Sequence, residues 1–239
     1  MLVLWFKGKF IYFALSSIIA IGLHGYYLFG PHIFYLLLLT FIVSTVFELL
    51  SLKTSLRCFG VKYWYTLNHP IFSSKIRFLG VYPLEVSLAW VLLKYMSFNL
   101  AMLITQAFLL PQGVVIILTP LILVSLDFII DPAYVNVKKM WQWEKGSGYF
   151  GIPWQNFLGW YLVGLLATVA YGLVEKGRPI TFNLLYLLPI IFYASFIKEA
   201  IPLLKISKKL AILGSIPLLL WSLLSLISLW VLYVRMTSI

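Results

Sequence analysis

Carboxylic acids stand at the ends of the long apolar runs in this sequence. Five of the seven acids fall there or in the adjoining loops: Glu48, Glu85, Asp127, Asp131 and Glu144. Ionisable groups in an apolar, membrane-like run are costly and usually functional. Glu48, Asp127 and Asp131 also lie where helices would end, and both the helix dipole and an apolar surround favour the protonated acid there. The pattern predicts groups able to act as general acids.

Asp127 and Asp131 are spaced four residues apart, so a helix would place them on one face and they could hold one proton between them. Pro132 biases Asp131 away from helical geometry, so this arrangement depends on the helix continuing past the proline. The alternative is structural: the acids would pair with cations and anchor the helix ends. The cations available for such pairing are Lys53, Arg57, Lys138 and Lys139.

The segment from Asp127 to Trp160 is rich in aromatic residues and holds four of the nine tryptophans. Trp141 and Trp143 could lie over one end of a substrate, where an indole face stabilises a cation. The alternative for both is the aromatic belt at the membrane interface. Residues 149–156 predict a tight turn into the following helix, with Asn156 as its N-cap.

The overall composition shows which elements must position these residues. The chain of 239 residues is 62% hydrophobic and 10% charged, with a mean hydropathy of +1.00, whereas soluble domains carry roughly 25% charged residues. We therefore expect one integral membrane domain over residues 1–239. The net charge of +11 comes from cations in short loops, which indicates topology control and contact with anionic lipids, not nucleic acid.

Apolar runs of about 20 residues predict an all-α bundle of seven transmembrane helices. Their expected ranges are 10–29, 33–50, 82–104, 113–131, 156–174, 181–200 and 211–233. The first lacks a small-residue cleavage site and should be retained. One side then receives 14 Lys and Arg residues and the other 3, which predicts a cytoplasmic N-terminus and an external C-terminus. The loops 51–80 and 132–155 would both face the cytoplasm.

Several other residues suggest no chemistry of their own. The single Cys58 cannot form an internal disulfide, and the sequence has no Cys/His cluster for a structural metal. His24, His32 and His69 are isolated, so packing or interfacial hydrogen bonding is favoured over metal ligation. Lys94 interrupts the third span and either extends toward the outer interface or pairs within the bundle.

Two sets of residues form a signature. The first set is Glu48, Thr54, Phe59, Gly60, Tyr63 and Tyr65. The second set is Asp127, Asp131, Pro132, Trp141, Trp143, Tyr149, Phe150, Gly151, Pro153, Asn156, Phe157, Gly159 and Trp160. Together they strongly resemble the membrane-bound carotenoid biosynthesis family that includes bisanhydrobacterioruberin hydratase. Ser55 stands where that family has a glycine after the threonine.

The resemblance implies a hydratase that adds water across the terminal 1,2 double bond of an acyclic C40 or C50 carotenoid, through a tertiary carbocation and without a cofactor or metal. The expected catalytic residues are Asp127, Asp131 and Glu48. The expected substrate-binding residues are Trp141, Trp143, Tyr149, Asn156, Thr54, Tyr63, Tyr65 and Trp160. Such an enzyme would be a multi-pass protein of the cell membrane with its active site toward the cytoplasm. Association with other carotenoid-biosynthesis enzymes is compatible with this role.

Markovnikov hydration requires an acid for C2, tolerance of a cation at C1, and one positioned water. Asp127 lies one turn deeper than Asp131, so the hypothesis makes Asp127 the proton donor. Asp131 and Glu48 would then hold or deprotonate the attacking water.

Three alternatives remain. A cyclase-like enzyme would use the same acid and cation, but a carbon–carbon double bond would capture the cation in place of water. A non-catalytic lipid-binding or transport protein would leave pigment composition unchanged. A prenyltransferase is disfavoured because it needs two Asp-rich motifs and only the Asp127/Asp131 pair is present.

Overall fold

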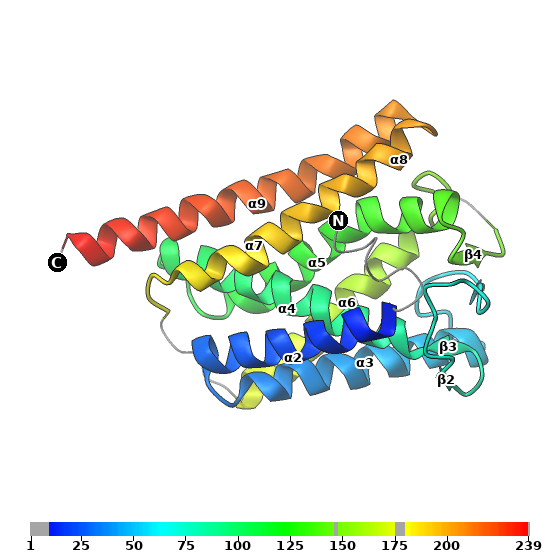
Figure 1. The fold of residues 1–239 in the computed structure, drawn as a ribbon, viewed down its shortest axis with the longest axis horizontal. Helices are drawn as coiled ribbons and strands as arrows, with labels where there is room; N and C mark the ends of the chain where they lie inside the picture. The colour runs from blue at the N-terminus through cyan, green and yellow to red at the C-terminus, as the bar shows by residue number, and fades with distance from the viewer. Residues whose placement is uncertain (1–9, 146–147, 175–179, 239) are drawn as a thin grey trace.

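The computed structural model describes residues 10–145, 148–174 and 180–238. In this part of the chain seven helical segments are long and apolar enough to cross a membrane, which confirms the predicted all-α, seven-span class. They form an elongated bundle of roughly aligned helices (Figure 1). The protein is therefore a multi-pass membrane protein.

The seven spans follow the predicted runs closely. The first five spans contain one α-helix each: α2 (Phe10–Phe29), α3 (Ile33–Lys53), α4 (Leu84–Ala107), α5 (Val114–Pro132) and α6 (Trp154–Val174). The sixth is a chain of short helices: η2 (Leu184–Tyr186), α7 (Leu187–Ala194), η3 (Ser195–Glu199) and α8 (Ala200–Leu204). The last is α9 (Lys208–Thr237), which extends beyond the predicted 211–233 at both ends.

Pro132 does not end the fourth span. The α5 helix continues into a π-helical turn, η1 (Ala133–Val137), in which the Lys138 amide donates to the Ala133 carbonyl at 3.0 Å. A wider turn accommodates the proline, which has no amide hydrogen of its own. Asp131 therefore remains helical and shares a face with Asp127, as the four-residue spacing predicts.

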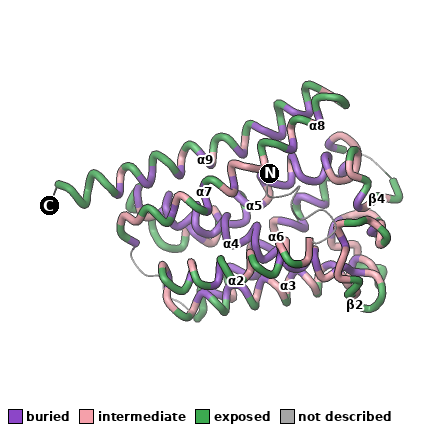
Figure 2. Tube along the Cα trace, viewed as in Figure 1, coloured by how far each residue is buried: buried purple, intermediate pink, exposed green. Residues whose placement is uncertain are grey.

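Helix α4 lies at the centre of the bundle. Within its most apolar stretch 89% of the residues are buried, a larger share than in any other described span. Figure 2 shows buried positions toward the middle of the bundle and exposed ones along the outer helices. The exposed side chains include Leu23, Leu173 and Trp230. Such outward apolar faces are typical of helices that contact lipid.

One end of the bundle carries the two long connections, residues 54–83 and the described residues 138–145 and 148–153, and we call it the acidic end. These connections pair through a small antiparallel sheet of β1 (Tyr63–Tyr65) and β4 (Trp141–Trp143). A second short pair, β2 (Arg77–Phe78) and β3 (Tyr82–Pro83), leads into α4. Figure 1 shows β2, β3 and β4 close together at this end.

A tight turn precedes α6, as the sequence predicts. The Tyr149 and Ile152 amides and carbonyls exchange two hydrogen bonds of 2.9 Å. The two residues between them, Phe150 and Gly151, have φ values of 49° and 91°. Positive φ at both central positions defines a type I′ turn, which favours glycine.

The side of the membrane that the acidic end faces stays a prediction. Four of the cations that enter the count, Lys7, Lys9, Lys176 and Arg178, lie outside the described residues. We expect protease-accessible tags at Met1 and within residues 133–145 to report the cytoplasm, and a tag after Ile239 to report the exterior, because positive loops are retained inside. Two termini on the same side would contradict the seven-span orientation.

Candidate active site

Glu48 lies near the C-terminus of α3, at the acidic end of the bundle, and forms the first of two hydrogen-bonded acidic centres. Its carboxyl is buried and accepts from the hydroxyls of Tyr63 and Tyr65, the latter at 2.9 Å, and from Trp90 Nε1 at 3.2 Å. Burial raises the pKa of both tyrosines well above the usual range, so each phenol keeps its proton and donates. Three donors converging on one carboxyl favour its ionised form and offset part of the cost of burying it.

The β1–β4 sheet explains how these aromatic residues meet. Tyr63 is opposite Trp143, and Tyr65 is opposite Trp141. Because side chains alternate along a strand, all four lie on one face of the sheet. Trp64, on the other face, is 44% exposed. The Tyr63 and Trp143 ring centroids are 4.9 Å apart, and those of Tyr65 and Trp141 are 6.0 Å apart.

Asp127 and Asp131 form a second acidic centre, on α5. The Asn156 side-chain amide donates to Asp127 Oδ2 and to Asp131 Oδ2, both at 2.6 Å. All three side chains are buried. The prediction that Asn156 caps α6 is wrong: the helix begins at Trp154, after Pro153, and the Asn156 side chain is committed to the two acids. The amide holds the carboxyls beside each other.

The alternative in which these acids anchor helix ends through ion pairs is not what the described residues show. The ion pairs described are Arg77–Glu85 at 3.8 Å and Lys138–Glu199 at 2.8 Å. Neither involves Glu48, Asp127 or Asp131. Lys138, one of the expected partners, is paired with an acid from the sixth span.

A cavity of about 720 Å³ joins the two acidic centres. Glu48, Asp131 and Asn156 line it, and so do five of the aromatic residues expected to bind substrate: Tyr63, Tyr65, Trp141, Trp143 and Trp160. The remaining lining is mostly apolar. Volume and lining of this kind are typical of a small-molecule site with a few convergent polar groups.

Three of the expected site residues do not line this cavity. Asp127 is fully buried behind Asp131 and reaches the site through Asn156. Thr54 is exposed at the end of α3, where its hydroxyl donates to the Leu50 carbonyl at 2.6 Å. Tyr149 packs its ring against Phe128, with centroids 5.2 Å apart. Thr54 and Tyr149 therefore stabilise the elements around the site.

Trp90 is a site residue that the sequence reading missed. It stands near the start of α4, in a long apolar run where nothing distinguishes it from a packing residue. Its indole donates to Glu48 and its ring lies 4.2 Å from that of Trp160.

The cavity also has a polar rim, formed by His69, Lys138 and Glu199. The Lys138 ammonium lies 3.9 Å from the Tyr134 ring centroid in addition to its ion pair with Glu199. Burial lowers the pKa of His69, so its imidazole is neutral near pH 7. His69 and Lys138 are partly exposed and can be hydrated, whereas Glu199 is buried.

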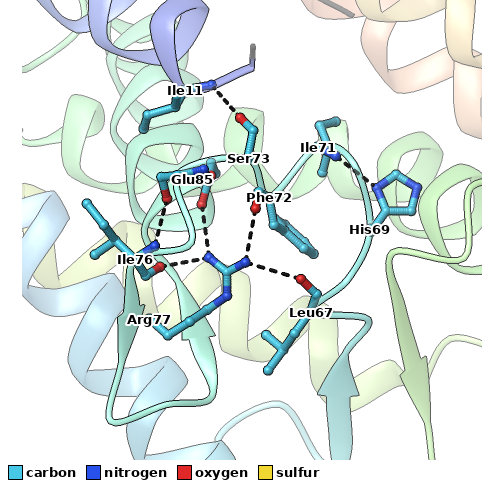
Figure 3. Close-up of polar contacts among 10 residues, drawn as sticks. Ile11, Leu67, His69, Ile71, Phe72, Ser73, Ile76, Arg77 and Glu85 are labelled. Atoms are coloured by element: carbon cyan, nitrogen blue, oxygen red, sulfur yellow. Dashed lines mark hydrogen bonds and ion pairs between the residues drawn. The ribbon is translucent and has the colours of Figure 1, made fainter. Parts of the chain in front are cut away.

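The 66–83 loop closes one wall of the cavity and is fixed by Arg77 (Figure 3). The Arg77 guanidinium donates to the carbonyls of Leu67 at 3.1 Å and Phe72 at 3.0 Å, and lies 3.8 Å from buried Glu85. Glu85 in turn accepts from the Ser74 amide at 2.7 Å. This network holds the loop against the start of α4.

Lys94 pairs within the bundle, the second of the two possibilities that the sequence left open. It is fully buried in α4, and its ammonium donates to the Gly164 carbonyl and the Thr168 hydroxyl of α6. It does not line the cavity. Among the described residues, no group of three or more His, Cys, Asp or Glu side chains is arranged to hold a metal ion.

The fold and cavity together define a polytopic α-helical membrane protein with a buried, aromatic and acidic pocket at one end. Over residues 9–228 the chain matches the model of the family described as carotenoid biosynthesis protein, and it belongs to that family. No curated protein and no solved structure gives a significant match. Family membership gives the protein a role in carotenoid biosynthesis and indicates carotenoid substrates.

Proposed function

We propose that this protein hydrates the terminal 1,2 double bond of an acyclic carotenoid, and gives a tertiary alcohol without a redox cofactor. The observation that carries the proposal is the cavity itself, an aromatic, mostly apolar chamber that ends on two separate buried carboxyl centres. The resemblance to the carotenoid family signature, through Glu48, Tyr63, Tyr65 and the segment from Asp127 to Trp160, supports the same reaction.

The first step is protonation of the alkene. Asp131 faces the cavity whereas Asp127 does not, which favours Asp131 as the acid that touches C2. The proton passes from the Asp131 carboxyl to C2, the alkene electron pair forms the new C–H bond, and C1 becomes a tertiary cation. Asp127, tied to Asp131 through Asn156, shares the proton of the pair and positions it. This changes the role that the sequence-based hypothesis gave to Asp127.

The cation then needs stabilisation until water arrives. The indole rings of Trp141 and Trp143 line the cavity beside the acids, and an aromatic face attracts a cation by about 0.5–2 kcal/mol. Glu48, held by its three donors, supplies a negative charge next to Tyr63 and Tyr65, which pack against these tryptophans. Electrostatic stabilisation of this kind is strong where bulk water is excluded.

Water capture completes the reaction. The water oxygen bonds to C1, and Glu48 accepts the proton that this water releases. The same proton then passes from Glu48 through cavity water to Asp131, which restores both carboxyls to their starting states, so the net change is addition of one water molecule. The polar rim of His69, Lys138 and Glu199 favours this outcome over cyclisation, because a cyclase must keep water from its cation.

Expression in a lycopene-producing host tests the reaction directly. We expect chromatography to show new, more polar pigments whose mass has increased by one water per modified end. A ring-containing pigment of unchanged mass would favour the cyclase-like alternative. An unchanged pigment profile from well-expressed protein would favour a non-catalytic lipid-binding or transport protein.

Replacement of Trp141 or Trp143 with alanine should lower turnover by roughly 2- to 30-fold, the range expected for loss of one cation–π contact. Trp64→Ala is the matched control, since this tryptophan lies on the same sheet but on its exposed face. Turnover should be measured on protein whose amount in the membrane has been quantified. Equal rates in all three variants would instead support the alternative in which Trp141 and Trp143 belong to the aromatic belt at the membrane interface.

A further inference from the structure

We propose that the cavity continues sideways as an apolar groove between α2 and α7, and that this groove takes up the linear polyene chain directly from the bilayer. The inference rests on the proposed function, because it supplies the acids with a substrate dissolved in lipid. It assigns a binding subsite to α2 and α7, which contribute no residue to the two acidic centres or to the β1–β4 sheet.

Both walls and the floor of the groove are helical. The α2 wall consists of Phe10, Phe13 and Ala14, and the apolar part of the α7–η3 wall consists of Leu188, Ile191, Phe192 and Phe196. The floor comes from α4, through Leu88, Ala89, Leu92 and Leu93. Figure 1 shows α4 lying between and behind the other two helices. These side chains are apolar, whereas Ser195 and Lys198 of η3 add polar groups to the lining, and the same cavity reaches Glu48 and Asp131.

The mouth of the groove lies at membrane depth. Leu188 and Ile191 line the cavity and are nevertheless 57% and 61% exposed, so the cavity opens past them to the outside of the bundle. Their span runs from Leu184 to Leu204. At 1.5 Å per residue, Ile191 is about 10 Å below the end of that span. An opening there meets lipid tails and not water.

Polar contacts at both ends hold α2 in place beside the groove. At the end away from the acids, His24 Nε2 lies 3.0 Å from the Leu185 carbonyl, and His24 Nδ1 lies 2.5 Å from the Tyr95 hydroxyl. At the acidic end, the Ile11 amide donates to Ser73 Oγ at 3.3 Å, as Figure 3 shows. The helix is thus fixed to η2 and to the 66–83 loop, and the groove lies between these contacts.

The occupant that fits is a linear, apolar, rigid molecule with a reactive end. A polyene in the bilayer can enter end first between α2 and α7, with its end group at the acids and the rest of its chain along the groove and in the lipid. A water-soluble substrate would instead meet the polar rim. The family's carotenoid substrates have the required chemistry.

Binding of lycopene to purified protein tests the groove without relying on turnover. Lycopene is achiral, so its visible circular dichroism reports the chiral surroundings of the bound state and yields a Kd. Ile191→Trp at the mouth and Ala89→Trp on the floor should weaken binding by about tenfold or more, the scale of overpacking. Leu184→Trp is the control, as Leu184 is 64% exposed in the same span but does not line the cavity.

The outcomes separate the groove from the reaction. Ile191→Trp replaces an exposed side chain, so it should fold even if Ala89→Trp does not. Wild-type lycopene affinity in folded Ile191→Trp would overturn the groove, even if the protein hydrates carotenoids. If the wild type binds lycopene more tightly than Ile191→Trp does but hydrates no carotenoid, the groove is supported and only the proposed reaction is overturned.

Discussion

Asp131→Asn is expected to lower carotenoid hydration by at least ~100-fold, the usual scale of general acid catalysis. Asparagine keeps the size of the side chain and still fits beside Asn156, but its amide cannot protonate an alkene. Lycopene binding should be retained, because the groove is unchanged. The rate should be compared with that of Glu144→Gln, which removes an exposed acid that does not line the cavity.

Asp127→Asn separates the two possible donors. If Asp131 delivers the proton, Asp127→Asn should be impaired less than Asp131→Asn, because a carboxyl still faces the substrate. In heavy water the wild-type product should carry one deuterium at C2 for each hydrated end, since the donated proton comes from an exchangeable carboxyl. Near-normal turnover in folded Asp131→Asn would transfer the donor role to Asp127 or Glu48.

Glu48→Gln is the second change with a large expected effect, again a loss of at least ~100-fold in turnover. Glutamine cannot accept the proton released by the attacking water and offers no negative charge to the cation. Its amide would also present donor hydrogens to a site where Tyr63, Tyr65 and Trp90 already donate. The free energy of unfolding should change less than the rate, because the substitution keeps the side-chain volume.

Tyr65→Phe provides a graded companion to Glu48→Gln. It removes one donor and leaves the carboxyl, and a hydrogen bond to a charged group contributes about 1.5–3 kcal/mol. Turnover should therefore lie between those of the wild type and Glu48→Gln. If Glu48→Gln were folded and turned over normally while Asp131→Asn did not, a single acidic centre would suffice and the water would be deprotonated by Asp131.

The sequence could predict the helices because each apolar run is long enough to require a membrane or a core. It could also predict the shared face of Asp127 and Asp131, which depends only on helix periodicity. It could not predict that Asn156 joins them, since that contact spans 25 and 29 residues and asparagine is also a common cap. The three-residue strands that bring Tyr63 to Trp143 are too short to give a periodic signal.

The lysine in the centre of α4 has a consequence for how the chain is assembled. A lysine in the middle of a membrane helix costs about 2.5–3.5 kcal/mol during insertion, and the groups that satisfy Lys94 are 70 and 74 residues downstream, on α6. When α4 leaves the ribosome, Gly164 and Thr168 have not yet been synthesised. Helix α4 should therefore stay beside the insertion machinery until α6 arrives, so the core of the bundle is completed late in translation.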